Sequence, residues 1–164
     1  PGAPMTTIEQ YNAFLRENTF AIVHGTLLQA AVTGAALERS LAESPQHFMV
    51  ACSWFCSISA ATVQVENHHI LTVHDGIIVP NLAAASDPAH RDALRMIATA
   101  ANNDHAAAAA FIVSLVDHVE NAPADEARAH AEHALLVFMA LCAYARRFHS
   151  DHRTADTCPL KVSR

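Results

Sequence analysis

The chain is poor in glycine, lysine and aromatic residues. Among its 164 residues there are four glycines and one lysine, and aromatic side chains make up 6%. Scarce glycine makes a loop that cradles a phosphate hard to build, and no phosphate-binding loop, nucleophile elbow or dinucleotide fingerprint occurs in the sequence. We therefore name no catalytic residues, and we favour a protein that is not an enzyme while leaving catalysis open.

Positive charge is also scarce. The formal net charge is −6 at pH 7. This argues against nonspecific binding to nucleic acid, because such binding needs clustered lysine and arginine. Half of the ten basic residues fall in the last nineteen positions, namely Arg146, Arg147, Arg153, Lys161 and Arg164. The body of the chain is thus more acidic than the total charge indicates.

Long apolar runs and signal sequences are absent as well. No run of about 18 apolar residues could span a bilayer, and no signal peptide opens the chain. Four cysteines do not make a disulfide framework in a chain of this length. We expect a cytoplasmic protein with no membrane partner, with Cys52, Cys56 and Cys142 reduced in the core. Residues 1–4 resemble a cloning remnant, so we expect one domain over 5–148 and a tail over 149–164.

Alanine supplies much of the 52% apolar content, which favours closely packed helices. The spacing of polar residues from Thr6 onward is that of a capping box and predicts a short helix to about Glu17. Asn18 or Thr19 can then cap a second helix that runs to about Ala42. We therefore expect two helices before the first proline of the body.

Gly25 and Gly34 fall inside the second predicted helix, where small residues suit a neighbouring helix packed very close. Ser44 followed by Pro45 predicts a third helix, which is apolar on nearly all sides and should form the buried centre. Later caps and breaks predict three more helices, over about 88–101, 105–120 and 124–148. The break between the last two is short enough to make them an antiparallel hairpin.

One segment interrupts the helical pattern with valine and isoleucine. Val63 and Val65 alternate with polar residues, as strand residues with one buried face do. Asp75 and Gly76 are typical of a type I′ hairpin turn, because both turn positions adopt positive φ. We predict a mainly α (α+β) fold of about six helices, with one small antiparallel β-hairpin or meander near 62–80.

Twelve histidines are an excess for a chain of this length. Glu126, His130 and His133 share one face of the last predicted helix, and the short turn before it would bring His118 alongside. A carboxylate with two or three imidazoles is a plausible ligand set for zinc or iron. The alternative is a solvated helix start, whose apolar face begins only at Leu135.

Other histidines have simpler interpretations. His68, His69 and His74 cluster on the predicted hairpin, where turn residues are the simpler explanation, because neighbouring strand residues point to opposite faces. His24 lies on an apolar helix face and is predicted to be buried with a hydrogen-bond partner. Neither the hairpin histidines nor His24 indicates a catalytic role.

These exclusions favour a non-catalytic protein-binding module of bacterial type, such as an adaptor, inhibitor or immunity-like protein. Acidic side chains gather around the predicted turn between the last two helices, namely Asp117, Glu120, Asp125 and Glu132. We predict that this patch meets a protein partner with a basic surface, because complementary charge speeds and selects an encounter. No cofactor and no nucleic-acid partner are expected, and homodimerisation stays open.

Two alternatives belong to other functional classes. The first is a metal-binding or metal-dependent helical protein that uses the histidine and glutamate cluster with zinc or iron. The second is a small enzyme in which a histidine acts as general base. Metal analysis of protein without a histidine tag would separate the first alternative from a binding module.

Overall fold

The computed structural model describes residues 7–63 and 69–152. Within these ranges the chain forms six α-helices and one two-stranded antiparallel sheet, which confirms the predicted fold class. In chain order the elements are α1 (Ile8–His24), α2 (Leu27–Leu41), α3 (Pro45–Thr62), β1 (Leu71–His74), β2 (Ile77–Pro80), the short 3₁₀ helix η2 (Leu82–Ala84), α4 (Pro88–Ala101), α5 (His105–Asn121) and α6 (Ala124–His152).

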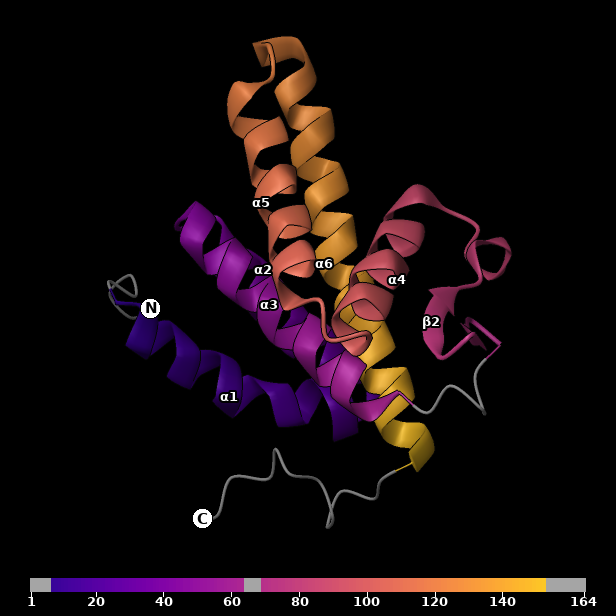
Figure 1. The fold of residues 1–164 in the computed structure, drawn as a ribbon. Coiled ribbons are helices and arrows are strands. Elements are labelled where there is room, and N and C mark those ends of the chain that lie inside the picture. Colours follow the sequence, from indigo (N-terminus) through magenta and orange to yellow (C-terminus); the bar gives the residue numbers. More distant parts are fainter. Residues whose placement is uncertain (1–6, 64–68, 153–164) are drawn as a thin grey trace.

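The helices pack around α6, the longest element (Figure 1). Helices α3, α4 and α6 make the most extensive mutual contacts and form the centre of the fold. Helices α1 and α2 pack on each other at one side of this centre, and the β-hairpin lies against α4 at the other. The α5–α6 hairpin extends beyond the rest, so the turn between these helices stands at one end of the molecule.

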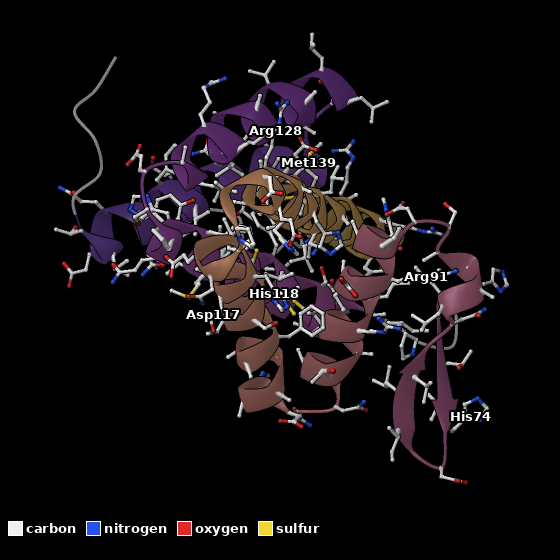
Figure 2. All side chains as sticks on the ribbon, turned by 90° about the horizontal axis from the view of Figure 1, so that it is seen from above. His74, Arg91, Asp117, His118, Arg128 and Met139 are labelled. Atoms are coloured by element: carbon white, nitrogen blue, oxygen red, sulfur yellow. The ribbon has the colours of Figure 1, made fainter. Side chains whose placement is uncertain are left out.

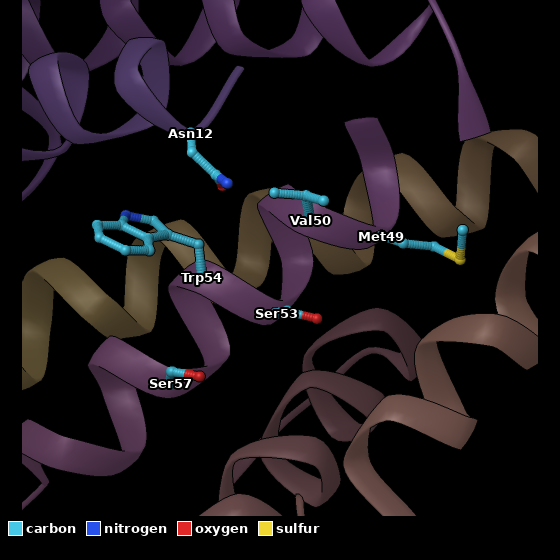
Figure 3. Close-up of a pocket in the computed structure, with 6 residues that line it drawn as sticks. All are labelled: Asn12, Met49, Val50, Ser53, Trp54 and Ser57. Atoms are coloured by element: carbon cyan, nitrogen blue, oxygen red, sulfur yellow. The ribbon is translucent and has the colours of Figure 1, made fainter. Parts of the chain in front are cut away.

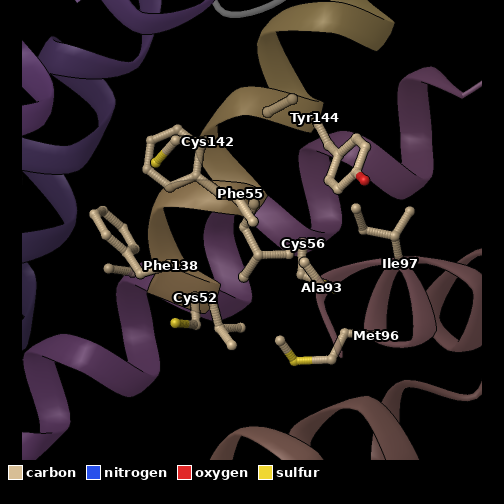
Figure 4. Packing of buried hydrophobic residues seen from close by; sticks show 14 of the residues in the cluster. Cys52, Phe55, Cys56, Ala93, Met96, Ile97, Phe138, Cys142 and Tyr144 are labelled. Carbon is tan, nitrogen blue, oxygen red and sulfur yellow. The ribbon is translucent and has the colours of Figure 1, made fainter. Parts of the chain in front are cut away.

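The core lies where α3, α4 and α6 meet (Figure 4). Phe55 of α3 and Phe138 of α6 contact each other edge to face, with ring centroids 5.9 Å apart. Alanines such as Ala93 and Ala145 are fully buried between the larger side chains. Small buried residues let helix axes approach closely, as the composition predicts.

The predicted boundary between the first two helices is wrong. The side chains of Asn18 and Thr19 each donate a hydrogen bond to the carbonyl oxygen four residues earlier, so neither caps a new helix and α1 continues past both. The break comes at Gly25, where Thr26 and Gln29 form a reciprocal capping box that starts α2. The cap that the helix uses is therefore eight positions later than the first candidate at Asn18.

The two glycines have different surroundings. A Cβ atom at Gly25 would clash with the carbonyl oxygen of Ala21, so the turn between α1 and α2 requires glycine there. At Gly34 an added Cβ would meet only Cδ1 of Ile22, at an ordinary 3.8 Å. The prediction that a helix packs very close to Gly34 is therefore wrong, and this face of α2 is open.

The hairpin turn is confirmed. Leu71 pairs with Pro80 in antiparallel register, and the turn residues Asp75 and Gly76 have φ of 51° and 76°. Val63 is the C-cap of α3 rather than a strand residue, and the rest of the first predicted strand lies outside the described residues. The described sheet is thus a hairpin of two strands.

Asn102, at the end of α4, holds the hairpin to the helices. Its side-chain oxygen accepts from the backbone N–H of Ile78 and its amide nitrogen donates to the carbonyl of the same residue, both at 2.8 Å. The Asn102 amide thus pairs with β2 as a neighbouring strand would.

Helix α6 runs to His152, beyond its predicted end at Phe148, and His149 is fully buried. No helix in the described ranges combines the length and apolar character that crossing a membrane requires.

Candidate functional site

The largest cavity described lies between α2 and the α5–α6 hairpin and has a volume of about 720 Å³. One wall is the C-terminal half of α2, and the opposite wall is formed by α5 and α6. Phe48 of α3 also lines it, together with Val116, Val119 and Leu135 from the opposite wall. The lining is mainly apolar, as ligand and peptide sites commonly are.

A second cavity of about 390 Å³ continues along α2 toward its N-terminus. The two cavities share Ala35 and Glu38 of α2. Phe138 and Met139 of α6 lie opposite, and Figure 2 shows Met139 on the side of α6 that faces α2. We call the two cavities together the α2 groove. From Ala30 to Ala42 it follows the helix for about 18 Å, at 1.5 Å per residue.

The C-terminal end of α2 is firmly held. The hydroxyl groups of Tyr11 and Ser40 lie 2.8 Å apart and are buried. The Tyr11 ring stacks on the imidazole of His47, with ring centroids 4.2 Å apart. Burial, partly offset by the Ser40 bond, raises the pKa of Tyr11 to about 12, so the phenol is protonated at physiological pH. These contacts join α1, α2 and the start of α3.

The N-terminal part of α2 stands apart from the core. Only Leu37, Ser40 and Leu41 of this helix are buried, all near its C-terminus. Leu27 and Leu28, at the other end, are 78% and 75% exposed. Large apolar side chains that are exposed together indicate an interaction surface. The sequence already contained a sign of this open surface. Along the groove, α2 carries only small residues between its exposed leucines and Glu38.

Glutamates line the wide end of the α2 groove. Glu38, Glu43 and Glu120 all border the larger cavity, with Arg39 as the one basic neighbour. Glu43 lies 3.6 Å from Nδ1 of His47. Among the described residues no ion pair involves Glu38 or Glu120. An apolar groove therefore ends in a cluster of negative charge.

The opposite end of the α2 groove carries positive charge. Arg146 of α6 lines the smaller cavity and donates to the backbone carbonyl of Ile22, at 2.9 Å. This bond ties α6 to the last turn of α1. Charge along the groove therefore runs from acidic near Glu120 to basic at Arg146.

The four residues of the predicted acidic patch are all exposed at the α5–α6 end of the molecule. Glu120 borders the α2 groove, whereas Asp117 borders a different cavity beside His118 (Figure 2). Glu132 accepts a hydrogen bond from Arg128 at 3.0 Å, and Asp125 lies in the first turn of α6. Two members of the patch thus border different cavities.

The predicted metal ligands are also divided. His118, Glu126 and His130 border one cavity of about 310 Å³, and the rings of His118 and His130 lie 5.7 Å apart. His133 points elsewhere and bonds to Asp92 of α4. The described ranges contain no group of three or more histidine, cysteine, aspartate or glutamate side chains that could hold a metal ion. Binding of zinc or iron stays a prediction.

His24 is half buried, and its ring meets that of His149 edge to face at 4.8 Å. Burial lowers the pKa of His24, and the nearby Arg146 lowers it further. Its Nε2 atom is buried and finds no hydrogen-bond partner within the described ranges, contrary to the sequence-based expectation. The neutral form of this histidine is therefore favoured.

A shallower cavity of about 350 Å³ lies between α1 and α3 (Figure 3). Asn12 lines it from α1, and Ser53, Trp54 and Ser57 line it from α3. Trp54 donates through Nε1 to the Thr19 hydroxyl at 2.7 Å, so this indole joins the two helices. No charged side chain lines this cavity, and nothing there indicates a reaction.

Two of the three histidines grouped on the predicted hairpin lie in the described residues. His69 and His74 are exposed, and His74 lies at the outer end of β1 (Figure 2), while His68 lies outside the described ranges.

Comparisons with protein-family models, curated proteins and solved structures found no match to this chain.

Proposed function

We propose that this protein is a non-catalytic protein-binding module whose partner presents a basic surface to the acidic end of the α2 groove. The observation that supports this most is the acidic rim, because Glu38, Glu43 and Glu120 border the largest apolar cavity described. An apolar centre with a polar, charged rim is the usual anatomy of a protein-binding surface.

The sequence predicted that the partner binds at the tip of the α5–α6 hairpin. Here we propose instead that it binds on the side of this hairpin that faces the α2 groove. Glu120 belongs to both surfaces, whereas Asp117, Asp125 and Glu132 lie outside the groove. The outer carboxylates act at longer range, where charge mainly affects the rate of encounter. Their effect is therefore expected in the association rate.

The test starts from a partner captured from the native host, whose binding kinetics are then measured in a salt series. The variant Glu38→Lys/Glu120→Lys should slow association by about tenfold or more at low salt, because opposite charge steers an encounter that salt screens. The matched control is Glu9→Lys/Glu17→Lys, which makes the same change in net charge at exposed positions of α1. An association rate that changes neither with salt concentration nor in either double variant would reject the proposal.

Metal binding at the turn between α5 and α6 is the alternative proposal. It is supported by the proximity of the His118 and His130 rings, and by the hydrogen bond of His118 Nδ1 with the backbone of Ser114. Such a bond orients an imidazole so that Nε2 is the atom open to a ligand. Calorimetric titration with zinc should show one site that His130→Ala removes and His105→Ala retains. Equal zinc binding by both variants would reject it.

A further inference from the structure

We propose that the partner binds through a single amphipathic helix that lies along the α2 groove, with its basic side chains at the Glu120 end. This inference rests on the proposed function and adds the class of element that the groove accepts. A helix in an apolar groove is a recurrent mode of peptide recognition, in which apolar anchors recur at i, i+4 and i+7.

The length of the α2 groove suits such a helix. An apolar stripe with anchors at i, i+4, i+7 and i+11 spans about 17 Å, which matches the length of about 18 Å along α2. The wall formed by α2 carries Ala30, Ala31, Gly34 and Ala35. These small side chains allow another helix backbone to come near, as in helix pairs that pack on small residues.

Exposed apolar side chains lie on both helices that border the α2 groove. Leu27 and Val32 are exposed on α2, and Leu136 and Met139 are exposed on α6, with Met139 lining the groove itself. Exposed methionine and leucine adapt readily to the shape of an apolar partner. A bound helix would remove Met139 and the apolar lining of the groove from water, which favours association.

Charge distinguishes this occupant from a second copy of the chain. A symmetric dimer with antiparallel grooves would place only Arg146 of each copy opposite Glu38, Glu43 and Glu120 of the other. Each chain also has a formal net charge of −6. Like charges at an interface oppose binding, whereas lysine or arginine opposite the same glutamates favours it.

The test uses the full chain and three labelled synthetic peptides of about 15 residues, which is about four helical turns. The first has leucines at helical spacing and lysines in its last two turns. The second replaces these lysines with glutamate, and the third keeps the composition of the first but removes the helical spacing of the leucines. Fluorescence anisotropy measures affinity, and circular dichroism measures the helix content of the bound peptide.

The basic amphipathic peptide should bind as a helix, and the other two should bind at least about tenfold more weakly, a difference that anisotropy resolves easily.

Ala35→Phe fills the groove from an exposed position that lines both cavities and should reduce binding by at least about tenfold. Gly34→Leu is a second groove-filling variant, because its Cβ has room. Ala13→Phe, at an exposed position of α1, is the matched control and should bind normally. Thermal unfolding confirms that each variant is folded.

Several outcomes would overturn the inference. Equal binding of all three peptides would show that the groove does not select a basic amphipathic helix. Peptide binding that Ala35→Phe and Gly34→Leu leave unchanged would show that the peptide does not bind in the groove. A wild-type dimer in sedimentation that Ala35→Phe dissociates would assign the groove to a second copy. Displacement of the peptide by dodecanoate, with tighter dodecanoate binding after Glu38→Lys/Glu120→Lys, would assign it to an apolar anion.

The two proposals fail in different ways. A captured partner that responds to salt and to Glu38→Lys/Glu120→Lys, but not to Ala35→Phe, would retain the binding function and reject the helix in the groove. A partner that responds to neither change would reject both.

Discussion

The Nε2 atom of His133 lies 2.8 Å from Oδ2 of Asp92, and this contact joins α6 to α4. Asp92 also accepts from Arg95 at 3.2 Å, one turn further along α4. The imidazole is 33% exposed and the carboxylate 19%, so the pair is partly shielded from water. His133 is thus part of a structural contact between helices, and it does not border the cavity that His118 and His130 line.

The contact between His133 and Asp92 predicts measurable coupling. In a double-mutant cycle with Asp92→Ala and His133→Ala, urea unfolding should give a coupling free energy of about 0.5–1 kcal/mol, because the pair is only partly exposed. The matched cycle on Arg128 and Glu132, an exposed pair within α6, should give about 0.3 kcal/mol. Coupling of zero between His133 and Asp92 would show that the two side chains do not interact in solution.

The bond between Trp54 and Thr19 can be followed by fluorescence, because Trp54 is the only tryptophan. Thr19→Val keeps the shape of the side chain but leaves the indole N–H without its partner. It should destabilise the protein by about 1–2 kcal/mol and shift the tryptophan emission. Thr99→Val is the control, since Thr99 also bonds to the backbone of its own helix, and that exposed hydrogen bond involves no indole. An unchanged unfolding free energy and emission in Thr19→Val would contradict the bond.

The lowered pKa of His24 predicts sensitivity to acid. A histidine whose folded pKa lies below its unfolded value contributes stability that is present above the unfolded pKa, near 6.5, and is lost as pH falls toward the folded pKa. The reason is that the unfolded chain gains the proton first. The unfolding free energy of His24→Gln should therefore decline less than that of wild type as the pH falls below 6.5. His105→Gln, at an exposed position of α5, should follow wild type. Identical slopes for His24→Gln and wild type would reject the shift.

The paired hydrogen bonds of Asn102 predict a local effect on the β-hairpin. Asn102→Ala leaves the N–H and C=O of Ile78 without their protein partners, so hydrogen exchange over β1 and β2 should accelerate by about tenfold or more. Exchange in α3 and α6 should stay slow. Asn121→Ala, which removes a side-chain bond at the end of α5, should leave the hairpin unchanged. Equal hairpin protection in wild type and Asn102→Ala would show that other contacts hold this segment.

The buried thiols should be unreactive in the folded protein. Burial raises the pKa of Cys56 to about 12 and raises those of Cys52 and Cys142 well above their usual range. Because the thiolate is the reactive form, none of the three should react with a disulfide reagent at pH 8 until the chain unfolds. Mass spectrometry after labelling identifies the modified residues. Rapid labelling of Cys142, which lines the smaller cavity of the α2 groove, would contradict its burial in the native protein.

Short-range patterns in the sequence determined much of the fold. Ser44, Asp87 and Asp104 cap their helices, because each side chain accepts from a backbone N–H three residues later. The turn at Asp75 and Gly76 follows from the φ preferences of two neighbouring residues. Such features depend on a few adjacent positions, so the chain itself specifies them.

The start of α2 shows where local patterns are ambiguous. Asn18, Thr19 and Thr26 are all suitable caps, but the first two bond backward within α1. Thr19 also accepts from Trp54, which is 35 positions away, and this contact fixes its side chain inside the bundle. The choice among equivalent caps was therefore made by packing between helices.

The candidate site depends on tertiary structure most of all. The sequence placed Glu120 in an acidic patch and His133 in a metal site, because both lie near the turn between the last two helices. Only the fold brings Glu120 beside Glu38 across an apolar groove, and His133 to Asp92, which is 41 positions away. Helical periodicity specifies which residues share a face, but the partner of that face depends on how helices distant in the chain pack together. The sequence by itself therefore determined most helix caps and the hairpin turn, whereas tertiary packing decided where α2 begins and that one face of it stays open.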